Sequence, residues 1–341
     1  MEQKEFKVNN FDLLRLMAAT EVIFDHYYEH LKLPLSHTAL KVIYLFPGVP
    51  VFFVLSGYLI SASYERNNSI GNYFRNRALR IYPGLWGCII LTLIVFTITG
   101  VNFFNKQTIA WLPTQLIGFI YTPGFLADYG FGSYNGSLWT IPVELQFYIA
   151  LPVCFLLTPK GKVTAWFIAL FIVFLGLNFI YQFAPQENKI TGLVRHTFIP
   201  HFYLFLTGVV FQRLKLYKSR FIYGKALYWA VPYLAFSMFF FDRIDAIYFT
   251  VMQYLFLAPM LISMAYTLPS LADKLLRKND ISYGIYIYHG LILTVIVEMN
   301  WVPHINLFMV IAATVILATL SWIFIEKPFI RRKARTIHAV E

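Results

Sequence analysis

The sequence predicts an all-α membrane protein with about ten spans and both termini in the cytoplasm. Of 341 residues, 58% are hydrophobic, only 13% are charged, and 34 are phenylalanine. A soluble core cannot hide this much apolar surface, and apolar runs long enough to cross a bilayer recur along the chain. We therefore expect a single membrane domain, residues 1–341, with a re-entrant or interfacial piece at 109–122. The predicted spans cover residues 11–30, 42–63, 81–100, 137–157, 163–183, 197–213, 223–241, 246–266, 281–299 and 305–326.

Lysine and arginine set the predicted orientation. With the N-terminus inside, cytoplasmic segments hold 21 of the 28 Lys and Arg residues, outer segments hold six, and Arg15 lies within the first span. Basic residues concentrate on the cytoplasmic side of membrane proteins. The net charge of +11 is therefore assigned to topology and not to nucleic acid. Cys88 and Cys154 lie inside apolar runs, so a disulfide framework is not expected.

The first span, 11–30, is unusual because an apolar helix carries several ionisable residues. Arg15 and His26 are eleven positions apart, which is three helical turns, and they differ by only about 20° around the axis. Ionisable groups within a span usually face the protein interior and are functional. The alternatives are an interfacial helix that wets its charges, or an Asp12–Arg15 pair that fixes packing.

Arg75, Arg77 and Arg80 lie close together before the third predicted span. Guanidinium groups bind phosphate oxygens through paired hydrogen bonds. For an arbitrary membrane protein, plain positive-inside anchoring is the favoured interpretation of such a cluster.

Two later spans also carry ionisable residues. Glu144 is expected about 10 Å below the outer surface, at a depth similar to that of His26, so the two could orient each other as a base and its partner. The alternative is a polar group that holds two helices together. For Tyr288 and His289, nearer mid-membrane, a structural role is the favoured interpretation of the bare residues. Ser56-Gly57 in the second span is typical of close helix contact.

Several short pieces follow one another in a recognisable order. They are Asp12…Arg15…His26, FFVLSGYLI at 52–60, FRNRALRIYP at 74–83, SLWTIPVELQFY at 137–148, SYGIYIYH at 282–289, and Glu326-Lys327-Pro328. Together they resemble the acyltransferase-3 family of integral-membrane acyltransferases, many of which O-acetylate bacterial surface glycans. The chain departs from the family pattern at Leu145, where a second acidic residue is common.

The resemblance implies an O-acetyltransferase of the bacterial inner membrane, with acetyl-CoA as co-substrate and no metal. The acceptor would be a hydroxyl of a surface polysaccharide (O-antigen, capsule or exopolysaccharide) or of its lipid-linked precursor. His26, as base or as transient acyl carrier, would be catalytic together with Glu144 and Arg15. The coenzyme would be bound by Arg75, Arg77, Arg80, Asp12 and Tyr82. The acceptor would be bound by Trp139, Tyr148 and His289.

Two other functions remain open at this stage. The acceptor could be a small molecule, or the protein could be a polytopic transporter, since intramembrane ions suit one. Against the transporter stands the lack of a detectable inverted repeat in the sequence.

Overall fold

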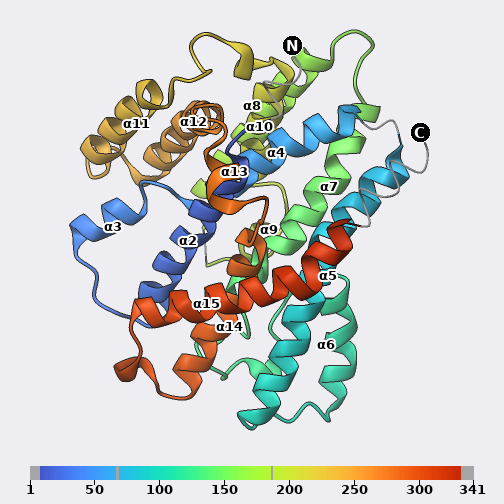
Figure 1. Cartoon of the computed structure of the whole chain (residues 1–341), viewed down its shortest axis with the longest axis vertical. Helices are drawn as coiled ribbons and strands as arrows, with labels where there is room; N and C mark the ends of the chain where they lie inside the picture. Colours follow the sequence, from blue (N-terminus) through green and yellow to red (C-terminus); the bar gives the residue numbers. More distant parts are fainter. Residues whose placement is uncertain (1–7, 67–68, 186, 332–341) are drawn as a thin grey trace. The chain divides into compact units, whose positions relative to one another are not determined.

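The computed structural model describes residues 8–66, 69–185 and 187–331, and over these ranges the chain is helical with no β-strand (Figure 1). The all-α prediction is therefore confirmed for the described residues. By length and composition, six helices in these ranges can cross a membrane: His37–Arg66, Ile70–Ile98, Gly136–Leu156, Val163–Phe183, Ala246–Ala265 and Leu307–Arg331. Ten spans and cytoplasmic termini stay predictions. The terminal basic residues used for orientation, Lys4, Lys7, Arg332, Lys333 and Arg335, lie outside the described ranges.

The predicted spans correspond to helices, and the ends of these helices differ from the predicted boundaries to varying degrees. Helices α2 (Phe11–His30) and α8 (Val163–Phe183) begin and end where the sequence predicts. Helix α5 (Ile70–Ile98) begins well before the predicted residue 81, so the arginine cluster lies within it. Helix α10 (Phe202–Arg213) begins later than residue 197. The predicted interfacial piece at 109–122 corresponds to α6 (Lys106–Leu116).

The described residues form two compact units, each assembled from segments distant in sequence. Over the described residues, the first unit is drawn from 8–18, 36–66, 146–185 and 187–278, and the second from 19–35, 69–145 and 279–331.

Helices α4 and α10 form the most intimate contact of the first unit. A Cβ atom at Gly57 of α4 would lie 1.9 Å from the Phe205 carbonyl oxygen, and one at Gly208 of α10 would lie 2.0 Å from the Val54 carbonyl oxygen. Only glycine permits such an approach. The expectation of close helix contact at Ser56-Gly57 is confirmed. Helix α4 spans Gly48–Arg66, and the other helices of this unit include α3 (His37–Ile43), α9 (Lys189–Arg195), α11 (Ala226–Phe240), α12 (Ala246–Ala265) and α13 (Leu271–Leu276).

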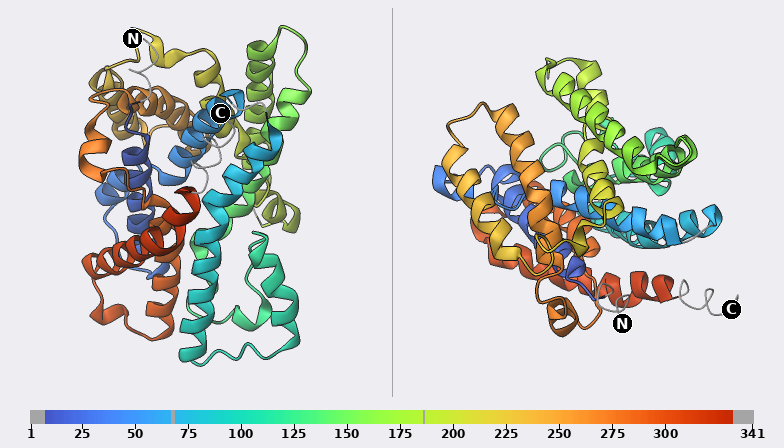
Figure 2. Two further views of the ribbon diagram at one scale, coloured as in Figure 1. Left: turned by 45° about the vertical axis from the view of Figure 1, so that its right-hand side comes forward. Right: turned by 90° about the horizontal axis from the view of Figure 1, so that it is seen from above.

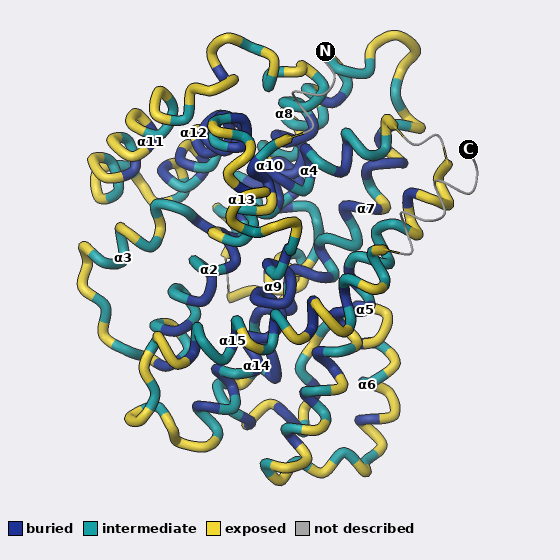
Figure 3. The backbone as a smooth tube through the Cα atoms, viewed as in Figure 1, coloured by how far each residue is buried: buried dark blue, intermediate teal, exposed yellow. Residues whose placement is uncertain are grey.

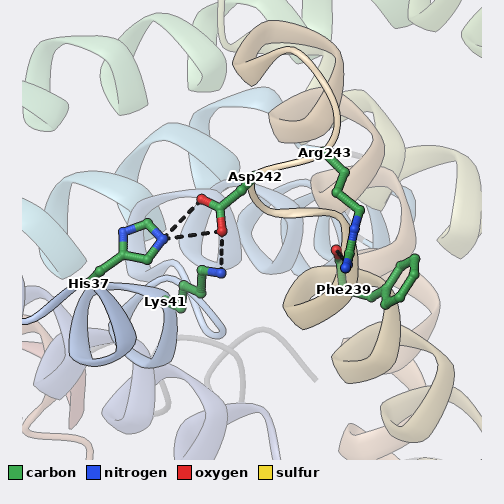
Figure 4. Close-up of polar contacts among 5 residues, drawn as sticks. All are labelled: His37, Lys41, Phe239, Asp242 and Arg243. Carbon is green, nitrogen blue, oxygen red and sulfur yellow. Dashed lines mark hydrogen bonds and ion pairs between the residues drawn. The ribbon is translucent and has the colours of Figure 1, made fainter.

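The loop between α11 and α12 is tied to α3 by charge (Figure 4). The Asp242 carboxylate accepts from Lys41 Nζ and lies 3.0 Å from His37 Nε2. These two hydrogen bonds hold the pKa of Asp242 below its ordinary value. Helix α11 itself packs along α12 (Figure 2).

Helix α14 (Ser282–Glu298) is the buried centre of the second unit (Figure 3). It packs against α15 (Leu307–Ser321), where a Cβ at Gly284 would lie 2.9 Å from Ala318 Cα. It also packs against α5, where the Tyr283 hydroxyl donates to the Ile81 carbonyl at 3.0 Å. The start of α7 (Thr140–Leu156), preceded by the 3₁₀ turn η2 (Gly136–Trp139), completes the surroundings of α14. A π-helical turn, η5 (Trp322–Glu326), follows α15.

Candidate active site

Two histidines from distant parts of the sequence meet in the second unit. His26, near the C-terminal end of α2, places its Nδ1 atom 2.9 Å from Nε2 of His289 on α14. The Nδ1 atom of His289 lies 3.0 Å from the carbonyl oxygen of Ile285, one turn earlier in the same helix. His289 is completely buried.

This chain of contacts assigns a tautomer to each ring. A carbonyl oxygen only accepts, so Nδ1 of His289 carries the hydrogen. A buried imidazole without a counter-charge is neutral, so Nε2 of His289 is an acceptor. Nδ1 of His26 is then the donor. The Nε2 atom of His26 keeps its lone pair and is the atom that can take a proton.

A third histidine continues this cluster. The ring of His30, one turn after His26, lies 4.6 Å from the His26 ring and stacks on Phe131 at 4.1 Å. Its Nε2 atom is buried and has no hydrogen-bond partner among the described residues. The sequence prediction omitted His30, although its spacing of four residues from His26 on one helix was a usable signal.

The loop that carries Phe131 is fixed on α14 by polar contacts. Asn135 Nδ2 donates to the Ile287 carbonyl at 2.8 Å, while Asn135 Oδ1 accepts from the Ser137 hydroxyl at 2.6 Å. A Cβ at Gly290 would lie 2.2 Å from Asn135 Oδ1, so a glycine is needed beside His289. Asn135 therefore holds this loop against the turn of α14 that bears His289.

Glu144 is half-buried on α7. Its charge acts on the Tyr286 hydroxyl, which shares a 2.8 Å hydrogen bond with Thr140. The Tyr286 ring in turn lies edge-on to His289, with 6.0 Å between centroids. The hydrogen-bond partner of His26 is His289, for which the residues alone favoured a structural role. Leu145 lies beside Gly118, where a Cβ would meet Leu145 Cδ1 at 2.5 Å.

The three predicted phosphate-binding arginines lie on the first half of α5 and differ in exposure. Arg75 is exposed, whereas Arg77 and Arg80 are half-buried. Arg80 donates to Asp280 Oδ2 at 2.5 Å, just before α14 begins. From Ser282, the first residue of α14, to His289 the rise along the helix is about 10 Å, so Asp280, which holds Arg80, and His289 lie at different levels along α14.

The other predicted residues are distributed over both units. Tyr82 donates to the Ile117 carbonyl at 3.1 Å, which holds the end of α6 against α5. Trp139 is half-buried at the end of η2. Asp12, exposed in the first turn of α2, half-buried Arg15 and buried Tyr148 belong to the first unit. Their binding and catalytic roles stay predictions.

Comparison with known proteins identifies the family to which the chain belongs. Residues 8–326 match the family model described as an acyltransferase domain. Nodulation protein 10 of Rhizobium leguminosarum bv. viciae is 32% identical, covering 96% of this chain and 95% of the relative. The O-acetyl transferase of Shigella phage Sf6 is 28% identical, covering 96% and 98%. The O-acetyltransferase OatA of Staphylococcus aureus is 27% identical over 42% of this chain and 26% of the relative. No solved structure matches.

The apolar helices and this match define an integral-membrane enzyme that transfers acyl groups. The chain belongs to the acyltransferase-3 family, and its relatives include proteins named as O-acetyltransferases. The resemblance seen in the sequence motifs is thus confirmed, and the transporter alternative is set aside.

Proposed function

We propose that this protein moves an acetyl group from cytoplasmic acetyl-CoA to a hydroxyl of a bacterial surface polysaccharide or of its lipid-linked precursor. The observation that carries the proposal is the pair of hydrogen bonds from Ile285 through His289 to His26. They leave the Nε2 atom of His26 as an oriented base beside a fixed loop. An alcohol is a poor nucleophile until a base removes its proton, and neutral imidazole suits this task.

In the proposed reaction, Nε2 of His26 takes the proton of the acceptor hydroxyl while the hydroxyl oxygen attacks the thioester carbonyl carbon. The carbon–sulfur bond then breaks, and the imidazolium returns the proton to the departing thiolate of coenzyme A. The products are an O-acetyl ester and free coenzyme A, so atoms and charges balance. His289 takes no proton in this scheme. It is a positioning residue.

The coenzyme would lie along α14, with its phosphates at the arginines of α5 and its thioester near His26. The rise of about 10 Å along α14 from Ser282 to His289 is a distance that an extended pantetheine arm can bridge. Arg77 and Arg80 would supply the hydrogen-bond donors for phosphate, with Arg80 oriented by Asp280. Asp12 and Tyr82 are the further proposed coenzyme residues.

The polysaccharide acceptor and the bacterial inner membrane are proposed from the resemblance of the sequence motifs to the acyltransferase-3 family. A phage O-acetyl transferase and the OatA proteins of a bacterium are the named precedents for acetylation of a hydroxyl. Trp139, Tyr148 and His289 are the acceptor-side residues proposed from the sequence. A small-molecule acceptor is the competing proposal within the same enzyme class.

The deciding experiment is mass spectrometry of surface glycan from cells with and without the gene. We expect one additional acetyl unit per repeat when the gene is present. Complementation with His26→Ala should not restore it, because loss of a positioned base slows a reaction by about 10²–10⁴-fold. His304→Ala, at an exposed histidine of the same unit, is the matched control and should restore acetylation.

Two results would contradict the proposal. If the glycan is unchanged and the purified protein acetylates a small molecule, the acceptor is a small molecule and not a polysaccharide. Near-normal acetylation by a His26→Ala protein that accumulates like the unaltered chain would remove His26 from the reaction.

A further inference from the structure

We propose that His26, Glu29 and His30 form a binding site for a divalent transition-metal ion such as Zn²⁺, and that the bound ion blocks the acetyltransferase. The three residues lie at positions i, i+3 and i+4 of α2. One ligand atom from each side chain lies within 4.8 Å of the other two. Two imidazoles and one carboxylate are the ligand set of many zinc sites, in which a fourth position stays open.

An unsatisfied buried atom supports the site. The Nε2 atom of His30 is buried without a hydrogen-bond partner among the described residues. Buried polar atoms are nearly always paired, and a bound ion would supply the partner that this nitrogen lacks. Gly136 lies beside it, and a Cβ there would be only 3.2 Å from the nitrogen, so a residue without a side chain avoids crowding this atom.

The surroundings of both rings also suit a metal. A metal-bound histidine usually donates its other ring N–H to an acceptor that fixes its tautomer and orientation. His26 does so, because its Nδ1 donates to His289, which is itself fixed on the Ile285 carbonyl. His30 is held by its stack on Phe131. Glu29 is exposed, so its carboxylate can turn toward the ion with little loss of packing.

The inhibitory part of this inference rests on the proposed function. The lone pair on Nε2 of His26 binds either an ion or a proton from the acceptor, but not both. An ion at this site therefore removes the base without changing the fold. Imidazole ligands favour zinc, copper, nickel and cobalt over magnesium and calcium, so we expect the first group to inhibit and the second to have no effect.

The first test is a calorimetric titration of ZnCl₂ into the purified full-length protein in lipid nanodiscs. We expect one zinc ion per chain, with binding at least about tenfold weaker in Glu29→Gln and in His30→Gln. Glu29 is exposed, so Glu29→Gln tests the site without disturbing the core. His304→Gln is the control and should bind zinc normally. Absence of zinc binding, or equal binding by all four proteins, would overturn the site.

The second test measures acetyl transfer from acetyl-CoA with and without ZnCl₂. Zinc should inhibit the unaltered protein reversibly, with activity restored by EDTA, and Glu29→Gln should need about tenfold more zinc. Magnesium should not inhibit. Zinc that binds through His30 and Glu29 yet leaves the activity intact would overturn the inhibitory role. If no acetyl transfer occurs at all, the proposed function fails, and the titration still decides the metal site.

Discussion

A neutral imidazole has one nitrogen that donates and one that accepts, so the hydrogen-bond partner of His26 decides which nitrogen is available for chemistry. In this chain the partner is another histidine, 263 residues away, and its own state is fixed by a backbone carbonyl within α14. In this relay the Nδ1 atom of His26 is held by a second imidazole. The basicity of His26 therefore depends on geometry and hydrogen bonding at His289.

Replacing His289 should lower the rate and leave acetyl-CoA binding largely intact. Without an acceptor at this position, Nδ1 of His26 is no longer held as the donor, and the ring can adopt the unproductive tautomer. We expect His289→Phe to lower kcat by an amount within the about 10²–10⁴-fold range of a positioned base, with a nearly unchanged KM for acetyl-CoA.

His289→Gln is the matched variant for this prediction, because its amide can accept from His26 and donate to Ile285. It should recover part of the lost kcat, and steady-state kinetics with near-native thermal stability would check this. Equal loss in both variants, with normal folding, would mean that His289 is needed for more than a hydrogen bond.

Arg77 tests the coenzyme side through a substitution that keeps its charge. Arg80 donates to Asp280, so its replacement also removes an ion pair, and Arg75 is exposed. Arg77→Lys keeps the charge but loses the planar pair of donors. A lost hydrogen bond to a charged group costs about 1.5–3 kcal/mol, so acetyl-CoA should bind on the order of ten- to a hundredfold more weakly.

Calorimetric titration of acetyl-CoA would measure this difference. Arg331→Lys, an exposed basic position of the same unit, should bind acetyl-CoA normally. Unweakened binding by Arg77→Lys would assign Arg77 to membrane anchoring alone.

At the scale of elements, the helices pack through positions where a side chain is missing. Gly57 and Gly208 face each other's helix, so α4 and α10 approach until backbone meets backbone. Such contacts gain dispersion energy in a membrane, where lipid tails weaken the hydrophobic drive for helix association. The Ser56-Gly57 pair made this contact predictable. Its partner Gly208 was not predictable, because a lone glycine in an apolar run has many uses.

Adding one methyl group at either glycine should loosen this contact. Gly57→Ala and Gly208→Ala would each place a carbon about 2 Å from a carbonyl oxygen, so the helices must separate. Overpacking of this kind costs about 1–3 kcal/mol. We expect a lower Tm in tryptophan-fluorescence melts of the detergent-solubilised protein.

Gly176→Ala is the control for these variants. Gly176 lies on α8 with nothing within 4 Å of a Cβ, so alanine there should be neutral or slightly stabilising. A Tm that falls equally in all three variants would refute the idea that close approach, and not glycine content, stabilises the unit.

The helix boundaries show where hydropathy alone was sufficient to locate the ends of a helix. Hydropathy located α2 and α8 well because polar residues flank both helices. It failed at the start of α5, where Arg75, Arg77 and Arg80 interrupt the apolar run although the helix continues through them. Hydropathy measures the preference of each residue for lipid, whereas helix continuity depends on backbone hydrogen bonds, which arginine side chains do not disturb.

At the scale of the whole molecule, the candidate site is built from segments that the sequence keeps far apart. The end of α2, the loop before α7 and the buried helix α14 meet in one unit. Sequence spacing revealed His26 because Arg15 lies on the same helix, three turns away. Spacing could not reveal that His289 meets His26, nor that Phe131 stacks on His30, because such contacts depend on tertiary packing. Residue counting suggested Glu144 as the partner of His26, because counting gives depth and not tertiary contacts.

The last prediction concerns the two sides of the membrane. Counting about 1.5 Å per residue through a core about 30 Å thick puts His26 and Glu144 about 8–10 Å below the outer face. The arginines of α5 are assigned to the inner face, and the rise of about 10 Å along α14 from Ser282 to His289 separates the two levels. We therefore expect donor and acceptor to enter from opposite sides, with the acetyl group carried across on the coenzyme.

Purified protein in sealed, oriented vesicles would test this arrangement. Acetyl-CoA supplied on the cytoplasmic side should support acetylation of an acceptor presented only on the outer side. The control is Arg77→Lys in identical vesicles, which should need more acetyl-CoA for the same rate because its phosphate contacts are weaker. Modification of the acceptor only when it shares a compartment with acetyl-CoA would show that the site opens inward. In that case the level of His26 in the bilayer, which rests on residue counting, would have to be revised.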